Sequence, residues 1–238
     1  MESKMAQALK LVNSPVAVVW TDRKPEDALQ FAEGKWGCVV SMITAAAKGR
    51  NVVFDEKSYG CGGGAAGLCF KKYELGYIEN FLSTGTPDKE GEFYKKTPEL
   101  ACQFIQSLPD ITVPTKYVVL KPLENMTDEE EPKSVIFLVN PDQLSGLVFL
   151  ANYDCPAGDK VTVFFGAGCH STILQVVAQG QSEDPKALIG LFDPSARPHV
   201  EKNLLSFSMP YKLFLQMEDN VEGSFLTKKT WLDLSKRI

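Results

Sequence analysis

Two stretches of this chain resemble each other, and their similarity constrains the fold more than any other feature of the sequence. Gly37–Gly49 and Gly168–Gly180 align without gaps and share a glycine, a cysteine, an alanine and a closing glycine. In both, the cysteine begins a stretch with helical spacing of its apolar residues. We expect an internal duplication with related halves at about residues 16–67 and 161–200. Chance similarity between two apolar helices is the alternative.

Strand and helix patterns are interspersed along the chain without regular alternation. This predicts an α+β protein, with a mixed sheet, flanking helices and a single domain over residues 1–238. The predicted strands are Val16–Trp20, Asn51–Phe54, Tyr117–Leu120, Val135–Val139, Val161–Phe165, Leu188–Phe192 and Leu204–Ser208. The predicted helices are Gly37–Lys48, Tyr73–Leu82, Thr97–Ser107, Pro141–Ala151 and Cys169–Ala178, with further helices after Pro210.

Composition narrows the function classes. A chain of 238 residues with 44% hydrophobic residues buries a core without needing a metal or disulfides. The net charge is -5 and no basic stripe is present, which argues against nucleic-acid binding. No apolar run approaches the roughly 18 residues of a membrane span, and no signal peptide is evident. We therefore expect a cytoplasmic protein without membrane contact, whose six cysteines are candidates for metal or redox chemistry.

Three of the cysteines lie beside glycines: Cys38, Cys61 and Cys169. A cysteine at the start of a helix faces free N–H groups and the positive end of the helix dipole, so we expect a lowered thiol pKa. The glycines leave backbone amides free and let a bulky group approach, and soft thiolates suit zinc or an iron–sulfur cluster. Cys38, Cys61 and Cys169 are thus the predicted metal ligands, with Gly62, Gly63 and Gly168 beside the cofactor.

The other cysteines carry weaker signals. No Cys-x-x-Cys pair is present, so neither ferredoxin spacing nor a zinc ribbon applies. Cys102 lies on an apolar helical face and is interpreted as a small buried hydrophobe. Cys69 and Cys155 are candidates for a fourth ligand.

Arg197 and His170 are polar residues that lie near these motifs in the sequence. Arg197, in the turn Asp193–His199, is predicted to neutralise a bound anion or a thiolate-ligated cluster; a surface arginine in a turn is the alternative. His170, next to Cys169, is expected to be a surface or capping residue.

Four separated motifs occur in a characteristic order: Tyr59–Gly64, Ile136–Pro141, Phe165–Cys169 and Asp193–Arg197. Together they resemble a widespread prokaryotic family known as domain of unknown function 169, or ArCR, from Val16 to about Met217. The resemblance implies a bacterial or archaeal protein, often from anaerobes, and no established activity.

The leading hypothesis from the residues is an iron–sulfur protein with a 4Fe–4S cluster in a redox or Lewis-acid role. A redox partner or a small-molecule substrate is then expected, and homo-oligomers are left open. The alternatives are a cofactor-free thiol enzyme with Cys169 or Cys61 as nucleophile, and a non-enzymatic module that binds a small anion. Whether the chain is an enzyme is not decided by the sequence.

Overall fold

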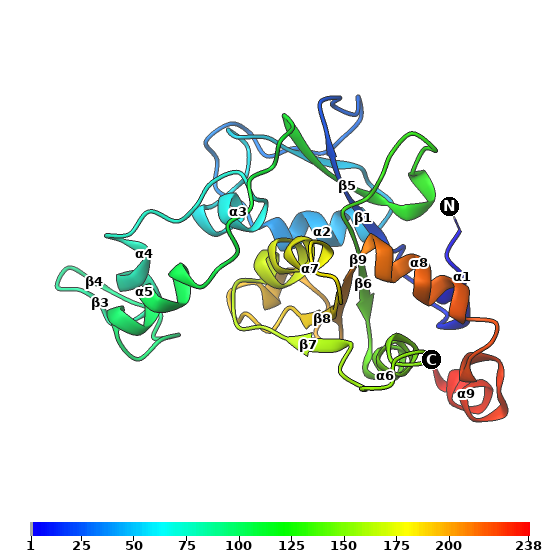
Figure 1. Cartoon of the computed structure of the whole chain (residues 1–238). Coiled ribbons are helices and arrows are strands. Elements are labelled where there is room, and N and C mark those ends of the chain that lie inside the picture. Colours follow the sequence, from blue (N-terminus) through cyan, green and yellow to red (C-terminus); the bar gives the residue numbers. More distant parts are fainter. Residues whose placement is uncertain (1) are drawn as a thin grey trace.

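The computed structural model describes residues 2–238, and a seven-stranded mixed sheet forms its centre (Figure 1). The strand order is β2-β5-β1-β6-β9-β8-β7; all neighbours are antiparallel except β7 and β8. The strands are β1 (Val16–Thr21), β2 (Val52–Phe54), β5 (Tyr117–Pro122), β6 (Ser134–Val139), β7 (Val161–Val163), β8 (Ala187–Gly190) and β9 (Leu205–Pro210). The prediction of an α+β protein with a mixed sheet is confirmed.

Helices cover both faces of the sheet. The helices are α1 (Lys4–Ala8), α2 (Val39–Ala47), α3 (Gly62–Gly67), α4 (Ile78–Leu82), α5 (Pro98–Gln106), α6 (Pro141–Ala151), α7 (Gln175–Gly180), α8 (Tyr211–Asn220) and α9 (Lys229–Leu234). A π-helical turn, His170–Leu174, runs directly into α7. Short 3-10 turns lie at Leu123–Asn125, Arg197–His199, Phe225–Thr227 and Ser235–Arg237.

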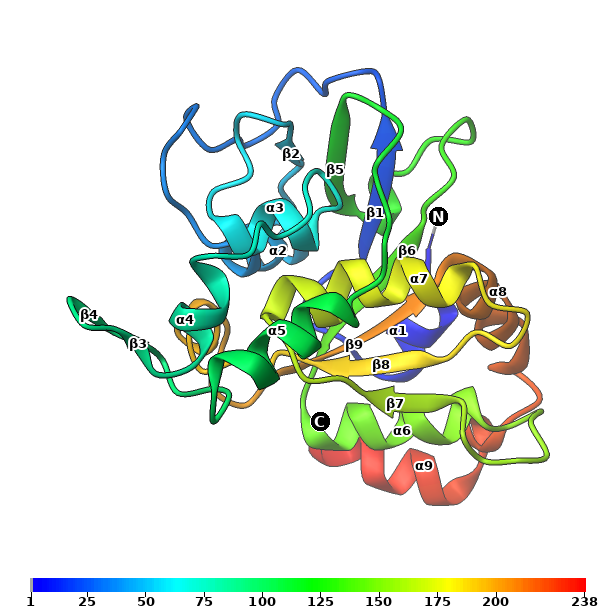
Figure 2. The same cartoon turned by 60° about the vertical axis from the view of Figure 1, so that its left-hand side comes forward.

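Alternating side chains of the strands divide the core into two clusters. In β1, Val16 and Val18 pack into the cluster that contains residues of α2 and α7, whereas Ala17 and Val19 pack into the cluster with α6 and α8. This follows from the period of two in a strand, which sends successive side chains to opposite faces. Figure 2 shows these layers at β8 and β7, with α7 above the two strands and α6 and α9 below them.

An arm extends from this body on the α3 side. It comprises α4, α5 and a small hairpin of β3 (Gly85–Thr86) and β4 (Lys89–Glu90), and it reaches outward in Figures 1 and 2. A helix was predicted over Tyr73–Leu82, but α4 begins only at Ile78 because Gly76 has a φ of 117°, outside the helical region. Tyr73 to Tyr77 therefore form an irregular segment between the body and the arm.

Two strands are shorter at their carboxyl ends than predicted. β7 ends at Val163, whereas its strand was predicted to continue to Phe165. β8 ends at Gly190, whereas its strand was predicted to continue to Phe192. Gly166 has a φ of 154° and Leu191 a φ of 66°, so the backbone turns away from the sheet after each strand. The released segments carry Phe164, Phe165 and Phe192 out of the sheet.

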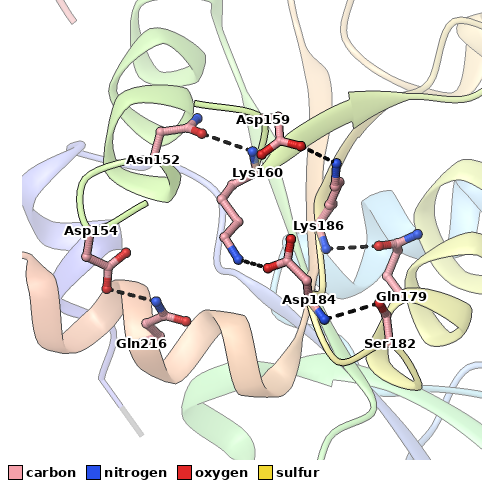
Figure 3. A network of polar contacts seen from close by, with 9 residues as sticks. All are labelled: Asn152, Asp154, Asp159, Lys160, Gln179, Ser182, Asp184, Lys186 and Gln216. Carbon is pink, nitrogen blue, oxygen red and sulfur yellow. Dashed lines mark hydrogen bonds and ion pairs between the residues drawn. The ribbon is translucent and has the colours of Figure 1, made fainter. Parts of the chain in front are cut away.

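The other end of β7 and β8 is held by a polar network. Lys160 pairs with Asp184, and Lys186 pairs with Asp159 at 2.7 Å, so the two loops that precede the strands are linked twice (Figure 3). The side chain of Asn152 also accepts a hydrogen bond from the Lys160 N–H. These contacts fix where the two parallel strands begin.

The predicted duplication stays a prediction. Each proposed half contains a strand, a helix on the same sheet face and a second strand parallel to the first: β1, α2, β2 and β7, α7, β8. However, β5 lies between β1 and β2, whereas β7 and β8 are direct neighbours. Separately, every helix within residues 2–238 is too short or too polar to cross a membrane.

Candidate functional site

A cavity of about 610 Å³ lies where the body meets the arm. Its walls come from the start of α2, the start of α3, the π-helical turn, α4, α5 and the segments that follow β7 and β8. Cys38, Cys61 and Cys169, which were predicted to act together, all line it, as do Gly62, Gly63 and Gly168. Tertiary structure thus brings three cysteines from distant parts of the chain to one cavity.

Cys38 is the residue that precedes the first turn of α2. Its backbone is extended, with φ -96° and ψ 125°, and its side chain is half-buried. Burial raises the pKa of the Cys38 thiol, although the N–H groups of Val40 and Ser41 act in the opposite direction. The sequence-based expectation of a lowered pKa is therefore wrong for Cys38, because desolvation outweighs the helix start.

Cys61 occupies the same position at α3. Its Sγ accepts a hydrogen bond from the Gly64 N–H at 3.2 Å, which satisfies one free donor of the helix. A Cβ on Gly64 would lie 2.4 Å from the Tyr59 carbonyl oxygen and 2.9 Å from Val39, so only glycine fits there. A Cβ on Gly62 would meet nothing within 4 Å. The glycine run thus packs tightly on one side and leaves open space on the other.

Cys169 precedes the π-helical turn and is 6% exposed. Its thiol donates a hydrogen bond to the Gly63 carbonyl at 3.2 Å. Burial raises the pKa of the Cys169 thiol well above its usual range, and negative charge on Cys61 or Cys38 would raise it further. Here too the expected lowering is wrong. The Cys61 and Cys169 thiols both bond to the Gly63–Gly64 segment, so these two side chains meet the same turn of α3.

The remaining cysteines do not line the cavity. Cys69 is buried under α3 with a positive φ of 65°, and burial raises its pKa to about 12. Cys102 lies on α5 and is only partly buried, so its interpretation as a buried hydrophobe is wrong; Cys155 lies in the loop after α6. Within residues 2–238, no three His, Cys, Asp or Glu side chains are placed to hold a single metal ion.

Sequence reasoning missed a buried pair, Tyr73 and His170. The Tyr73 hydroxyl and His170 Nε2 share a hydrogen bond of 3.0 Å, and the rings meet edge to face. His170 is 2% exposed, so the expectation of a surface or capping residue is wrong. Burial lowers its pKa to about 4, which keeps the imidazole neutral at pH 7. Its Nδ1 is buried and has no hydrogen-bond partner.

The burial of this histidine has no counterpart in the local sequence pattern. Tyr73 reaches it from the irregular segment before α4, and both residues line the cavity. Burial also raises the pKa of the Tyr73 hydroxyl, so this group stays protonated. The only sequence signal was the position of His170 next to Cys169, which does not indicate where the imidazole points.

Asp193 and Arg197 both belong to the turn Asp193–His199, but only Asp193 lies at the cavity. Asp193 lines the cavity; its carboxylate accepts hydrogen bonds from the N–H groups of Gly168 and Ser195 and from the Ser195 hydroxyl. Arg197 does not line the cavity. Its guanidinium donates to the carbonyl oxygens of Leu191, Leu204, Glu201 and Lys202, at 2.6 to 3.5 Å. Arg197 therefore braces the loop between β8 and β9, which differs from the predicted contact with a cofactor.

Comparison with known proteins adds one finding. No curated protein and no solved structure matches the chain. A family model does match, over residues 4–220, which is most of the sequence. The motifs noted above at Tyr59–Gly64 and Phe165–Cys169, which contribute Cys61 and Cys169 to the cavity, lie within that range. The chain belongs to this family, DUF169, which is described as uncharacterised ArCR.

Proposed function

We propose that this chain is an iron–sulfur protein in which Cys38, Cys61 and Cys169 hold a 4Fe–4S cluster. These three residues form the part of the cavity that is called its floor below. One observation carries the proposal: three cysteines from three separate segments line a single cavity, each next to a glycine. A soft donor set of this kind suits iron–sulfur chemistry.

The donor set favours a cluster over a single ion. A single tetrahedral ion with Zn–S bonds of about 2.3 Å needs its sulfur ligands about 4 Å apart. A cluster separates its ligand sulfurs more widely, by ~6–7 Å, because several metal atoms lie between them. The three thiols line one cavity, and within residues 2–238 no three side chains are placed to hold one ion. A cluster would need the thiols at the wider spacing.

The surrounding residues would do three things for such a group. The Gly64 N–H already donates to Cys61 Sγ, and hydrogen bonds to ligand sulfurs tune the potential of a cluster. Gly62 leaves room beside the thiols, since a Cβ there would meet nothing within 4 Å, whereas a Cβ on Gly63 would lie 3.4 Å from the Tyr73 hydroxyl and 3.8 Å from Cys61 Sγ. The aromatic residues of the arm would shield the floor from water.

Three protein ligands leave one iron without a cysteine, facing the rest of the cavity. When bound, the cluster supplies either an electron or a Lewis-acid iron to a small molecule there. The chain's own residues would then orient that molecule: the Tyr73–His170 pair on one side and the turn at Asp193 on the other.

The two alternatives have less support. An activated thiol nucleophile requires a lowered pKa, whereas burial raises the pKa of Cys169, one of the two candidate nucleophiles. A small-anion module requires cations or free donors, and no Lys or Arg lines the cavity within residues 2–238.

Purification without oxygen tests the proposal, followed by assays of iron and acid-labile sulfide and a visible spectrum. We expect about four iron and four sulfide per chain, as the cluster type dictates, with a brown colour that oxygen bleaches. A colourless chain without iron, prepared without oxygen and after attempted reconstitution with iron and sulfide, would overturn it.

A further inference from the structure

Away from its three cysteines, the cavity is lined largely by aromatic side chains. Nine of the lining residues are aromatic, contributed by the arm, by the segment before α2 and by the segments after β7 and β8. Several of these rings are exposed at the rim, and Trp36 is 75% exposed. Exposed large aromatic side chains that border a concave site commonly mark a place where a ligand binds.

The charges around the cavity favour one class of ligand. Asp193 and Glu74 line it, and within the described chain no Lys or Arg does. Two lysines contact lining rings without lining the cavity themselves. The Lys95 ammonium lies over Phe104 and Phe165, 5.0 and 4.2 Å from the ring centroids, and Lys89 donates to the Tyr77 hydroxyl at 3.2 Å. A phosphate, sulfonate or carboxylate would therefore enter an acidic, apolar site without a partner.

One polar atom beside the cavity lacks a hydrogen-bond partner within the protein. It is His170 Nδ1, which is buried, whereas Nε2 is occupied by Tyr73. Gly166 lies against this atom, since a Cβ built on that glycine would be 3.4 Å from Nδ1. Buried polar groups are costly when unpaired, so a ligand with a matching polar atom would gain by reaching it.

From these observations we infer that the cavity binds an uncharged or cationic aromatic small molecule, stacked among the rim rings, with one polar atom toward His170. Anionic molecules are selected against. The inference names the ligand of the same cavity, and it rests on the proposed function only for the reaction that this ligand would undergo.

A matched pair of fluorescent probes tests the ligand class. N-phenyl-1-naphthylamine is uncharged, and 8-anilinonaphthalene-1-sulfonate is the same ring system with a sulfonate added. We expect the uncharged probe to bind the full-length protein at one molecule per chain, at least tenfold more tightly than the sulfonate. Equal affinity, or preference for the sulfonate, would overturn the inference.

Two exposed aromatic residues localise the probe. Trp36 lines the cavity and is 75% exposed; Phe149, on α6, does not line it and is 70% exposed. Trp36→Ala should weaken binding of the uncharged probe at least fivefold, and Phe149→Ala should leave it unchanged. The same loss in both variants, or in neither, would contradict binding in the cavity.

A charge reversal tests the selection against anions. Glu74 is exposed and lines the cavity, so Glu74→Lys should be tolerated by the fold. It should raise the affinity for the sulfonate probe at least threefold without changing that for the uncharged probe. If Glu74→Lys binds both probes with the affinities of the wild type, the charge at the cavity does not select against anions, and that part of the inference is wrong.

Iron measured on the same samples separates this inference from the proposed function. An iron-free chain that binds the uncharged probe as described would remove the cluster and keep the ligand class. An iron-containing chain that prefers the sulfonate would keep the cluster and remove the ligand class.

Discussion

The Cys169 thiol donates a hydrogen bond to the carbonyl oxygen of Gly63, 106 residues away in the chain, at 3.2 Å. This contact joins the π-helical turn to the glycine-rich helix α3. The two segments are also in direct contact. A Cβ built on Gly67 would lie 2.5 Å from Sγ of Cys169 and 2.8 Å from Cβ of Cys169. The glycines of α3 therefore set how closely Cys169 approaches Cys61.

Gly67→Ala should displace Cys169 and destabilise the fold. The added methyl group overlaps both atoms of a buried side chain, and overpacking of this kind costs about 1–3 kcal/mol. The matched variant Gly62→Ala adds the same group in open space and should be neutral or stabilising by up to about 1 kcal/mol. Chemical denaturation of both measures the difference. Equal stability of the two variants would contradict the close packing at Cys169.

Serine in place of each proposed ligand should remove the cluster. Cys38→Ser, Cys61→Ser and Cys169→Ser are each expected to lose at least half of the bound iron, because oxygen is a poorer ligand for this group than thiolate. Cys102→Ser is the control, since Cys102 does not line the cavity. Iron content and the visible spectrum of anaerobically purified variants give the answer. Retention of iron in all three single variants would assign it to other residues.

Arg197→Lys should lower stability without emptying the site. Lysine keeps the charge but cannot reach several carbonyl oxygens with a planar fork, and charge-assisted hydrogen bonds contribute about 1.5–3 kcal/mol. Arg50→Lys, at an exposed arginine, should change the free energy of unfolding by less than about 0.5 kcal/mol. If Arg197→Lys instead keeps full stability and loses iron or probe binding, Arg197 acts on the ligand, as the sequence first suggested.

Cys69 should make the metal-free protein less stable in alkali. Its thiol pKa is raised by burial from 9.0 to about 12, so between these values the unfolded chain releases a proton that the folded chain keeps. The free energy of unfolding then falls as the pH rises, by about 1.4 kcal/mol per pH unit. Urea unfolding of wild type and Cys69→Ala between pH 8 and pH 10.5, a range chosen from that window, measures this. The wild type should lose stability more steeply; parallel curves would show that the folded thiol ionises normally.

The lysine network should support the sheet without affecting the cavity. Lys160→Met removes the pair with Asp184, whose carboxylate side chain is 62% exposed, so the loss should be no more than about 1 kcal/mol. The pair lies before β7 and β8, at the end opposite to the cavity (Figure 3). Iron content and probe affinity of Lys160→Met should match the wild type. A clear change in either would mean that the start of these strands is coupled to the site.

Local sequence patterns predicted the strands and helices well where one rule dominated. β1 and β6 each contain an unbroken apolar run, Val16–Trp20 and Val135–Val139, and α6 begins with Asn140 as its cap and a proline in its first turn, so their positions followed from the residues. The patterns were wrong where a backbone angle interrupts them. Gly76, Gly166 and Leu191 turn the chain out of the helix or strands that were expected. Those interruptions release the aromatic residues that line the cavity.

The sequence by itself determined the α+β class, the glycines beside Cys38, Cys61 and Cys169, and the grouping of these cysteines as one candidate site. Such features are local: glycine spacing and helix starts depend on near neighbours in the chain. Only the tertiary structure decided which groups are buried away from water. Desolvation raises the pKa of Cys169 and keeps His170 neutral, because it depends on residues that fold over a side chain from far away in the sequence. Arg197 points toward backbone carbonyl oxygens that the folded loop between β8 and β9 presents.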